Sequence, residues 1–238
     1  MTQPDASARC KWPMASVDPF AAAGFTGHPP SLIAAWNETD LAVGMASLSD
    51  AEIERLGRMQ SERRRADMAG SFVVRRRLIA DLTATRPGEV SITALSEGAP
   101  VLARPPGWSV TIANKDALTL VALDRAPAEI GADVEVMRRV NWKPMLAMTC
   151  SDREHAAFIE AFEGQPDAGE AFFRMWTLKE AALKSTQRGF RAGPKAVETN
   201  VDILAAPGEG RLFAFGARFQ FWTALVGEAV VSLVRKQP

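Results

Sequence analysis

The segment WTLKEAALK, residues 176–184, holds an aromatic ring, a hydroxyl, a carboxylate and two lysines within a few helical turns. In a helix, residues three and four positions apart share one side, so Trp176, Thr177, Glu180 and Lys184 form a single stripe. One interpretation of the stripe is an exposed Glu–Lys pair, which stabilises a helix by roughly 0.2–0.5 kcal/mol. The other is one wall of a binding site. This segment by itself leaves both interpretations open.

A second segment, GADVEV at residues 131–136, has the pattern of a strand. Alternate strand residues face opposite sides, so Asp133 and Glu135 share one face while the apolar residues between them pack inward. The two carboxylates either face water or join Glu180 around a cation. Three carboxylates suit Mg²⁺, which prefers oxygen ligands and often bridges substrate phosphates. Lys184 would then meet a phosphate oxygen as a point charge.

The predicted elements of the N-terminal half begin after an irregular arm. Residues 1–30 are rich in Pro, Ala, Gly and Asp, and we expect them to form this arm without regular structure. Short apolar segments at 32–36 and 41–46 are typical of strands. Ser49, with Glu52 three residues later, has the pattern of a capping box at a helix start.

A long helix is predicted over residues 62–83, followed by strand-like segments up to residue 122. This helix is the most basic part of the chain, with arginines at positions 63–65 and 75–77. A solvated helix face accounts for most of these arginines. The alternative for one or two of them is a phosphate contact.

The C-terminal half repeats this order. A strand at 130–136 precedes a helix that starts at Ser151 and the helix that carries the first segment, and strand-like segments follow at 211–225 and 228–234. The sequence therefore predicts an α+β fold of two similar lobes, with an N-terminal lobe over 31–129 and a C-terminal lobe over 130–238 that carries the metal site.

Composition limits the function classes. The formal net charge is zero, which does not suggest nucleic acid or an anionic membrane as a partner, and no apolar run approaches the roughly 20 residues of a membrane span. The two cysteines, Cys10 and Cys150, form no CxxC motif, which indicates a reducing cytoplasm. The two histidines, His28 and His155, have no nucleophile motif beside them.

Together, the G-A-D-V-E and W-T-L-K-E-A-A-L-K segments resemble the 4′-phosphopantetheinyl transferases of the surfactin-synthetase-activating type. The hallmark of that family is G-[IV]-D-x-E followed by [FW]-[SCT]-x-K-E-[AS]-x-x-K. The resemblance extends from about Leu48 to Phe190. It implies a two-lobed monomer in pseudo-two-fold arrangement, with coenzyme A bound between the lobes.

The resemblance also implies the reaction. Members of the family transfer the 4′-phosphopantetheine arm of coenzyme A to a serine of an acyl or peptidyl carrier protein, with Mg²⁺, and release 3′,5′-ADP. Asp133, Glu135 and Glu180 would hold the ion, and Asp133 and Lys184 would also lie against coenzyme A. Glu180 would help to deprotonate the carrier serine, and Lys184 would stabilise or protonate the departing phosphate.

The sequence departs from the family pattern at three places that are expected to bind coenzyme A. Where the family has N-x-S-H-S, the histidine is replaced by Asn114, which donates hydrogen bonds without charge, and Lys115 follows as a compensating cation. The lysine of the family's G-K-P turn is Ala99, and the G-x-G-[LF] element reads QRGF at 187–190. Other basic residues that could bind coenzyme A are Arg55, Arg75 and Arg76.

Two alternatives to the transferase follow. A catalytically impaired member of the family would act as a binding module for coenzyme A or a carrier protein. In the other alternative, every charged residue named above lies on a solvated face.

Overall fold

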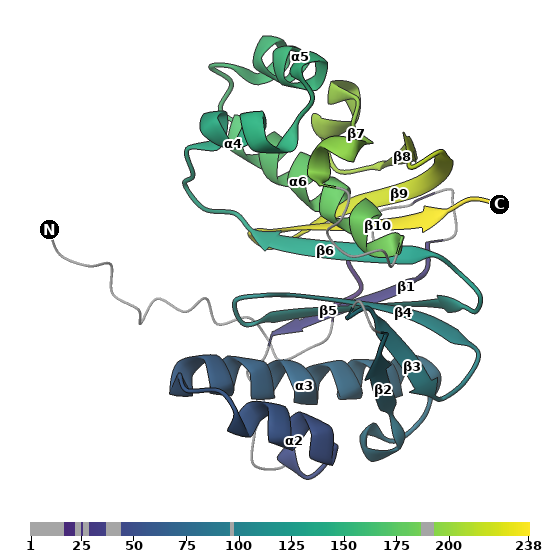
Figure 1. The fold of residues 1–238 in the computed structure, drawn as a ribbon. Coiled ribbons are helices and arrows are strands. Elements are labelled where there is room, and N and C mark those ends of the chain that lie inside the picture. The colour runs from purple at the N-terminus through teal and green to yellow at the C-terminus, as the bar shows by residue number, and fades with distance from the viewer. Residues whose placement is uncertain (1–16, 22–24, 26–28, 37–43, 96–97, 187–192) are drawn as a thin grey trace, which may run out of the picture.

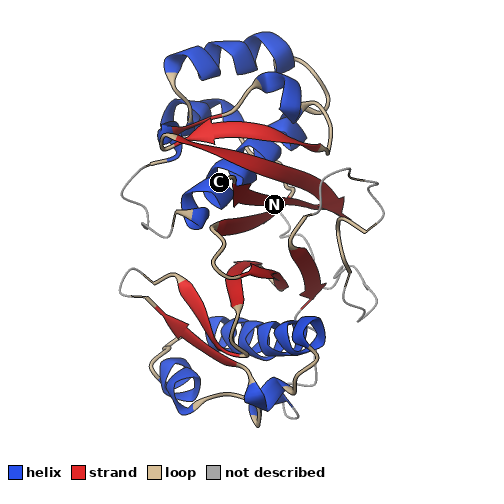
Figure 2. Cartoon of the chain, turned by 90° about the vertical axis from the view of Figure 1, so that its right-hand side faces the viewer, coloured by secondary structure: helices blue, strands red, loops and turns tan. Residues whose placement is uncertain are grey.

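The computed structural model describes residues 17–21, 25, 29–36, 44–95, 98–186 and 193–238. It has four layers, in which two antiparallel sheets lie between outer helices (Figure 1). The view from the side shows helices below the first sheet and above the second (Figure 2). Within the described residues, no helix is long and apolar enough to cross a membrane.

The N-terminal lobe is built on a three-stranded sheet of order β1-β5-β4, with a separate β2-β3 hairpin. The predicted helix at 62–83 is confirmed as α3, and the predicted capping box is confirmed at the start of α2, where Glu52 Oε2 accepts from the backbone nitrogen of Ser49 at 2.9 Å. Its elements are β1 (Ser31–Trp36), α2 (Asp50–Gly57), α3 (Glu62–Thr83), β2 (Ser91–Ala94), β3 (Pro100–Arg104), β4 (Trp108–Lys115) and β5 (Leu118–Arg125).

The C-terminal lobe has a five-stranded sheet of order β6-β10-β9-β8-β7, covered by the long helix α6. The predicted segment at 211–225 is a hairpin of two strands. The elements are β6 (Ile130–Val136), α4 (Trp142–Thr149), α5 (Asp152–Phe162), α6 (Ala168–Ser185), β7 (Val197–Glu198), β8 (Glu209–Ala214), β9 (Ala217–Val226) and β10 (Ala229–Lys236).

The two lobes share one topology. In each, the first strand pairs with the last, and the last pairs with the strand before it, which gives β1-β5-β4 in one lobe and β6-β10-β9 in the other. The prediction of an α+β fold with two similar lobes is therefore confirmed. The connection 126–129 joins β5 to β6, and we propose it as the boundary between lobes 31–129 and 130–238.

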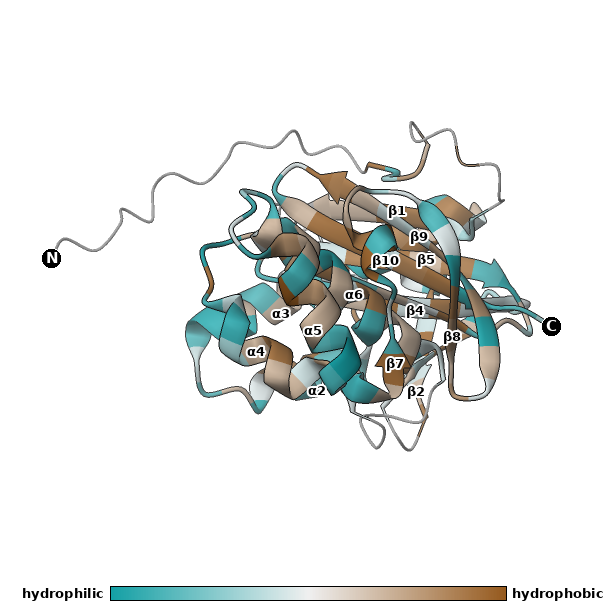
Figure 3. Ribbon diagram, turned by 90° about the horizontal axis from the view of Figure 1, so that it is seen from above, coloured by the Kyte–Doolittle hydropathy of each residue, from teal (hydrophilic) through white to brown (hydrophobic). Residues whose placement is uncertain are grey.

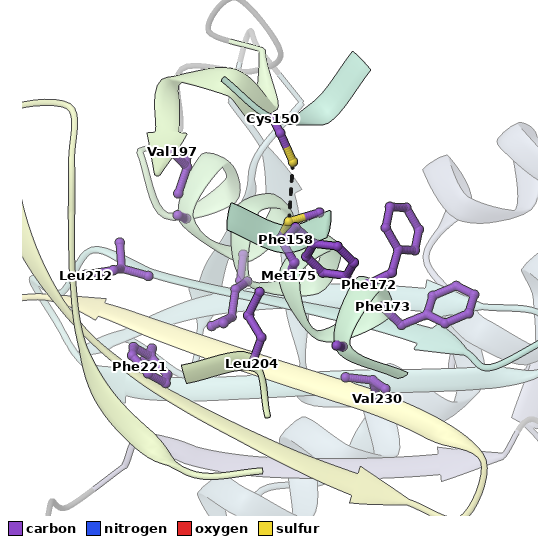
Figure 4. Close-up of a cluster of buried hydrophobic side chains, with 14 of the residues drawn as sticks. Cys150, Phe158, Phe172, Phe173, Met175, Val197, Leu204, Leu212, Phe221 and Val230 are labelled. Carbon is purple, nitrogen blue, oxygen red and sulfur yellow. Dashed lines mark hydrogen bonds between the residues drawn. The ribbon is translucent and has the colours of Figure 1, made fainter. Parts of the chain in front are cut away.

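Each interface between layers has its own apolar core. Val74 and Leu78 of α3 pack against the first sheet, and Met175 and Leu178 of α6 belong to the cluster over the second. Figure 4 shows part of that second cluster, including Phe172, Phe221 and Val230. A third cluster fills the space between the sheets, and its members include Leu32, Leu120, Ala132, Val134, Trp222 and Leu233.

Strand β5 is buried on both faces because it lies in the middle of these layers. Residues 118–123 are all buried, because α3 covers one face of the strand and the second sheet covers the other. In the view from above, the inner strands carry much of the hydrophobic colour, and the outer helices α4 and α5 mix hydrophilic with hydrophobic residues (Figure 3).

The structure differs from two expectations for the N-terminal region. The strand predicted at 41–46 is wrong for Gly44 and Met45, which lie in a helical turn, and residues 41–43 lie outside the described residues. In the described part of the predicted arm, Val17 forms a bridge with Ala34 of β1, and Phe20 is buried in the cluster between the sheets.

Candidate functional site

Gly131 determines how closely β6 approaches α6. A Cβ atom at this position would lie 2.0 Å from the carbonyl oxygen of Ala181 and 2.5 Å from the backbone nitrogen of Ser185. No side chain fits in that space. Asp133 and Glu135 lie at alternate positions from Gly131, so they share its face of the strand and point to the side of the sheet that α6 covers.

The opposite face of β6 packs as expected. Ala132 and Val134 belong to the cluster between the two sheets. The backbone nitrogen of Ala132 donates to Thr111 Oγ1 of β4 at 3.2 Å, so β6 lies beside the first sheet. The carboxylates therefore stand at the junction of the two lobes.

Helix α6 is fixed against the strand pair that carries these carboxylates. Thr177 Oγ1 and Ser232 Oγ are 2.7 Å apart and fully buried, and Ser232 of β10 is the pairing partner of Asp133. Thr177 lies one turn before Glu180 on α6. The hydroxyl of the WTLKEAALK segment thus acts as an anchor for the helix.

Asp133 and Lys184 form the central ion pair of the site. The Lys184 ammonium lies 2.6 Å from Asp133 Oδ1, which joins residues of β6 and α6. Burial raises the pKa of Asp133, although the charge and hydrogen bond of Lys184 oppose this shift. The predicted pairing of the two segments is thus present as a direct contact.

Glu180 contributes a third carboxylate to the same region. It is 9% exposed and forms no hydrogen bond or ion pair with any other residue that the structure describes. Burial raises its pKa, the negative charges of Asp133 and Glu135 raise it further, and Lys184 opposes them. The three predicted acidic residues therefore lie near enough to repel one another.

Glu135 is held by two cations from different parts of the chain. Its Oε2 atom lies 2.8 Å from the Lys115 ammonium and 3.0 Å from Nη1 of Arg138. Lys115 is the last residue of β4, so this ion pair crosses from one lobe to the other. The structure thus brings Lys115, Asp133, Glu135, Glu180 and Lys184 together.

Asn114 precedes Lys115 and faces the other side of β4. Its Oδ1 accepts from Ser71 Oγ of α3 at 2.5 Å and from Thr119 Oγ1 at 3.0 Å. Both bonds use the carbonyl end of the amide. The NH₂ end, with its two donors, is the part of the side chain suited to an anionic group.

The three predicted arginines differ in their surroundings. Arg76 is buried, and its guanidinium donates to Glu52 and to the backbone oxygens of Pro87 and Val90. It therefore ties α3 to α2 and to the segment that precedes β2, and its guanidinium is bound to groups of the protein itself. Burial opposes the ionisation of Glu52, but hydrogen bonds from Arg76, Ser49 and Arg75 outweigh it and hold the pKa of Glu52 at about 2.

Arg75 and Arg55 flank one aromatic ring. The Arg75 guanidinium lies 4.1 Å from the ring centre of Phe72 and pairs with Glu52 at 2.5 Å, and Arg55 lies 5.8 Å from the same ring. The buried Nε of Arg75 has no hydrogen-bond partner among the described residues. Burial lowers the pKa of Arg75, against the influence of Glu52. These two arginines form a separate cationic group on α2 and α3.

The predicted metal ligands fit a hard cation in their chemistry. Three carboxylates supply oxygen donors only, and their mutual repulsion would be relieved by a cation among them. Among the described residues, however, no three His, Cys, Asp or Glu side chains form a group that could hold a metal as they stand. Lys184 and Lys115 occupy carboxylate oxygens there. The metal site stays a prediction.

One charged residue of the WTLKEAALK segment has a structural role that the sequence reasoning missed. Lys179 is fully buried and its ammonium lies 2.7 Å from Glu154 Oε2, while Glu154 Oε1 accepts from the nitrogen and hydroxyl of Thr199. The signal was available, since Lys179 lies in the same helical stripe as the apolar residues Met175 and Ala182.

Comparison with known proteins relates this site to a family. Residues 129–233 match the family model of the 4′-phosphopantetheinyl transferase superfamily, and this range includes the Asp133, Glu180 and Lys184 positions. The predicted QRGF element at 187–190 also falls within it but lies outside the described residues.

Two curated relatives carry the same family name. The chain is 35% identical over 127 residues to the 4′-phosphopantetheinyl transferase AcpT of Salmonella typhimurium, a match that covers 53% of this chain and 60% of that protein. It is 31% identical over 159 residues to the 4′-phosphopantetheinyl transferase HetI of Nostoc sp., covering 64% of this chain and 65% of that protein. The matches thus span less than two thirds of each relative. Residues 129–233 are thus similar to the 4′-phosphopantetheinyl transferase superfamily.

Proposed function

We propose that this protein transfers the 4′-phosphopantetheine arm of coenzyme A to a serine of an acyl or peptidyl carrier protein, with Mg²⁺, and releases 3′,5′-ADP. The observation that carries the proposal is the convergence of Asp133, Glu180 and Lys184 where the two lobes meet. The names of the AcpT and HetI relatives support the reaction class.

The chemistry of each side chain supports a role in the transfer. The carboxylate of Glu180 accepts the proton of the carrier serine as its oxygen forms a bond to phosphorus, and the raised pKa of Glu180 makes it a stronger base than an ordinary glutamate. The phosphorus–oxygen bond of the pyrophosphate breaks at the same centre. Lys184 stabilises the charge that develops on the departing 3′,5′-ADP or protonates it.

Asp133, Glu135 and Glu180 are the residues that would hold Mg²⁺. When bound, the ion would neutralise charge on the pyrophosphate and orient it for in-line attack. The carrier protein supplies the nucleophile, which agrees with the lack of a nucleophile motif in this chain. In this proposal, Asp133 and Lys184 also contact coenzyme A.

Coenzyme A would be bound by side chains from both lobes. Lys115 lies beside the carboxylates, and the NH₂ group of Asn114 is a neutral donor on the same strand. Arg55 and Arg75 form the cationic group around Phe72 and would meet a more distant phosphate. The burial of Arg76 gives it a structural role in this proposal.

We also propose that the protein works as a monomer in the cytoplasm, with no nucleic acid or membrane as partner. The balanced charge of the chain and its two cysteines without a CxxC motif support this setting.

A binding module for coenzyme A or a carrier protein is the second candidate. It is favoured by Asn114, which stands where the family has a histidine and which is already bonded to Ser71 and Thr119. Coenzyme A would then bind without being cleaved.

The test is a carrier-labelling experiment. Purified protein is incubated with coenzyme A, Mg²⁺ and a panel of acyl and peptidyl carrier proteins, and each carrier is weighed by mass spectrometry. We expect a gain of one 4′-phosphopantetheine group on at least one carrier, and no gain without Mg²⁺. Unlabelled carriers throughout would contradict the transferase, and calorimetric binding of coenzyme A in the same samples would then favour the binding module.

A further inference from the structure

The ion pair between Lys115 and Glu135 joins the two lobes at the candidate site. Lys115 ends β4 of the N-terminal lobe, and Glu135 lies on β6 of the C-terminal lobe, with 2.8 Å between the ammonium and Oε2. The side chains are 26% and 15% exposed, so solvent screens the pair only in part. A residue that the proposed function places against coenzyme A is thus bound to a predicted metal ligand.

The charges of the site are balanced by the protein itself. Asp133, Glu135 and Glu180 supply three negative charges. Three cations among the described residues contact the first two of these carboxylates: Lys184 binds Asp133, while Lys115 and Arg138 bind Glu135. Because these three negative and three positive charges cancel, a divalent ion added alone would leave the site with an excess of two positive charges. The ion would also have to displace a lysine from one of the carboxylates. The pyrophosphate diester of coenzyme A carries the two negative charges that restore the balance.

We infer that Lys115 is an exchange residue: it neutralises Glu135 in the free protein and moves to the pyrophosphate of coenzyme A when a divalent ion takes its place on Glu135. This inference rests on the proposed function and adds to it a coupling between two ligands. The ion must displace Lys115 from Glu135, and coenzyme A offers the displaced ammonium a new anionic partner. Conversely, coenzyme A needs a free Lys115, which the ion releases. The ion and coenzyme A therefore strengthen each other's binding by the same factor.

Lys115 is better suited to this exchange than the second cation on Glu135. Arg138 is three residues from Glu135 in the chain, donates to the backbone oxygen of Val136 and lies 5.5 Å from the ring centre of Phe173. These local contacts hold it in place. Lys115 has a flexible side chain and reaches Glu135 from the opposite lobe. Its release therefore breaks this one ion pair between the lobes.

The experiment measures metal binding and does not depend on catalysis. Mn²⁺ is titrated into the 238-residue protein with and without coenzyme A, and free Mn²⁺ is followed by electron paramagnetic resonance. The variants are Lys115→Gln, which removes the charge, and Lys115→Arg, which keeps it. Lys143→Gln is the matched control, because Lys143 forms an exposed pair with Glu163 at 2.5 Å. Thermal unfolding confirms that each variant is folded.

We expect coenzyme A to tighten Mn²⁺ binding by the unsubstituted protein about tenfold, which is a typical size for coupling between two ligands. In Lys115→Gln, Mn²⁺ should bind about two- to fivefold more tightly without coenzyme A, because a partly exposed competing ion pair has been removed. The tightening by coenzyme A should fall by the same factor, to about two- to fivefold, and the coupling that remains comes from the attraction between the ion and the pyrophosphate. Lys115→Arg and Lys143→Gln should keep the coupling.

Two results would overturn the exchange. One is equal Mn²⁺ affinity and equal coupling in Lys115→Gln and the unsubstituted protein. The other is an unsubstituted protein that binds no Mn²⁺ even with coenzyme A present. Intact coupling without label on any carrier would instead contradict the proposed transfer reaction and leave the exchange supported.

Discussion

The ammonium of Lys179 lies 2.7 Å from Oε2 of Glu154, and both side chains are buried. Lys179 also donates to the backbone oxygens of Pro194 and Val197, while Thr199 donates to Glu154. The pair therefore ties α6 and α5 to the segment 194–199. Because Lys179 immediately precedes Glu180, the same contacts fix the position of the helix turn that carries the candidate base.

Breaking this buried pair should strongly destabilise the protein. We expect Lys179→Met to lower the free energy of unfolding by about 3–5 kcal/mol, because Glu154 is left as a buried charge without its partner. Urea denaturation followed by circular dichroism measures the change. The control Lys143→Met breaks an exposed pair and should cost at most about 1 kcal/mol. A loss below 1 kcal/mol for Lys179→Met would contradict the structural role.

Glu180→Gln should separate stability from activity. The folded-state pKa of Glu180 is raised above its ordinary value of 4.5, so folding favours the protonated form, and the stability present below pH 4.5 is lost as the pH rises through the raised pKa. Glutamine does not ionise, so the variant does not lose stability in this way as the pH rises. At pH 7 it should unfold at the same denaturant concentration as the unsubstituted protein or at a higher one. Carrier labelling should fall by about 10²- to 10⁴-fold, the range for loss of a general base. Unchanged labelling would rule out the assigned role.

Gly131→Ala tests the close contact between β6 and α6. The new methyl group would overlap the backbone at Ala181 and Ser185, so the strand and helix must separate, at a cost of about 1–3 kcal/mol. Labelling should fall as well, since Asp133 moves relative to Lys184. The matched control is Gly169→Ala in α6, where, among the described residues and apart from the neighbouring backbone of the helix itself, nothing lies within 4 Å of the added group. Alanine there should be neutral or stabilise by up to about 1 kcal/mol. Equal stability of the two variants would contradict the predicted contact.

Glu52 should contribute stability that depends on pH. Its pKa is lowered from 4.5 to about 2 in the folded protein, so its contribution is present above pH 4.5 and is lost as the pH falls from 4.5 toward 2. The difference in unfolding free energy between the unsubstituted protein and Glu52→Gln should therefore be largest at neutral pH and shrink at pH 3. Urea denaturation at pH 7, 5, 4 and 3 measures this. Glu54→Gln removes an exposed carboxylate of the same helix and serves as the control. A difference that grows in acid would contradict the assignment.

Much of the fold follows from local pattern. The bounds of α3 and β6 agree with the predicted ranges 62–83 and 130–136, because a turn at Pro87 and Gly88 follows the helix and charged residues alternate with apolar ones along the strand. The strand-like segment at 90–94 is present as β2, but helix α4 and strand β3 were missed. Helix α4 includes Pro144 in its first turn, where proline is tolerated but hides the helical pattern, and β3 is short and partly exposed.

For the candidate site too, some features follow from the sequence alone and others depend on the tertiary structure. The sequence by itself determined which residues bear charge and that Asp133 and Glu135 share one face of a strand, since side-chain alternation is a property of the backbone. Only the tertiary structure decided their partners: Lys184 binds Asp133, Lys115 crosses from the other lobe to Glu135, and Arg76 is buried on Glu52. Such contacts join residues far apart in the chain, and they depend on how β6, α6 and β4 pack, which no local pattern specifies.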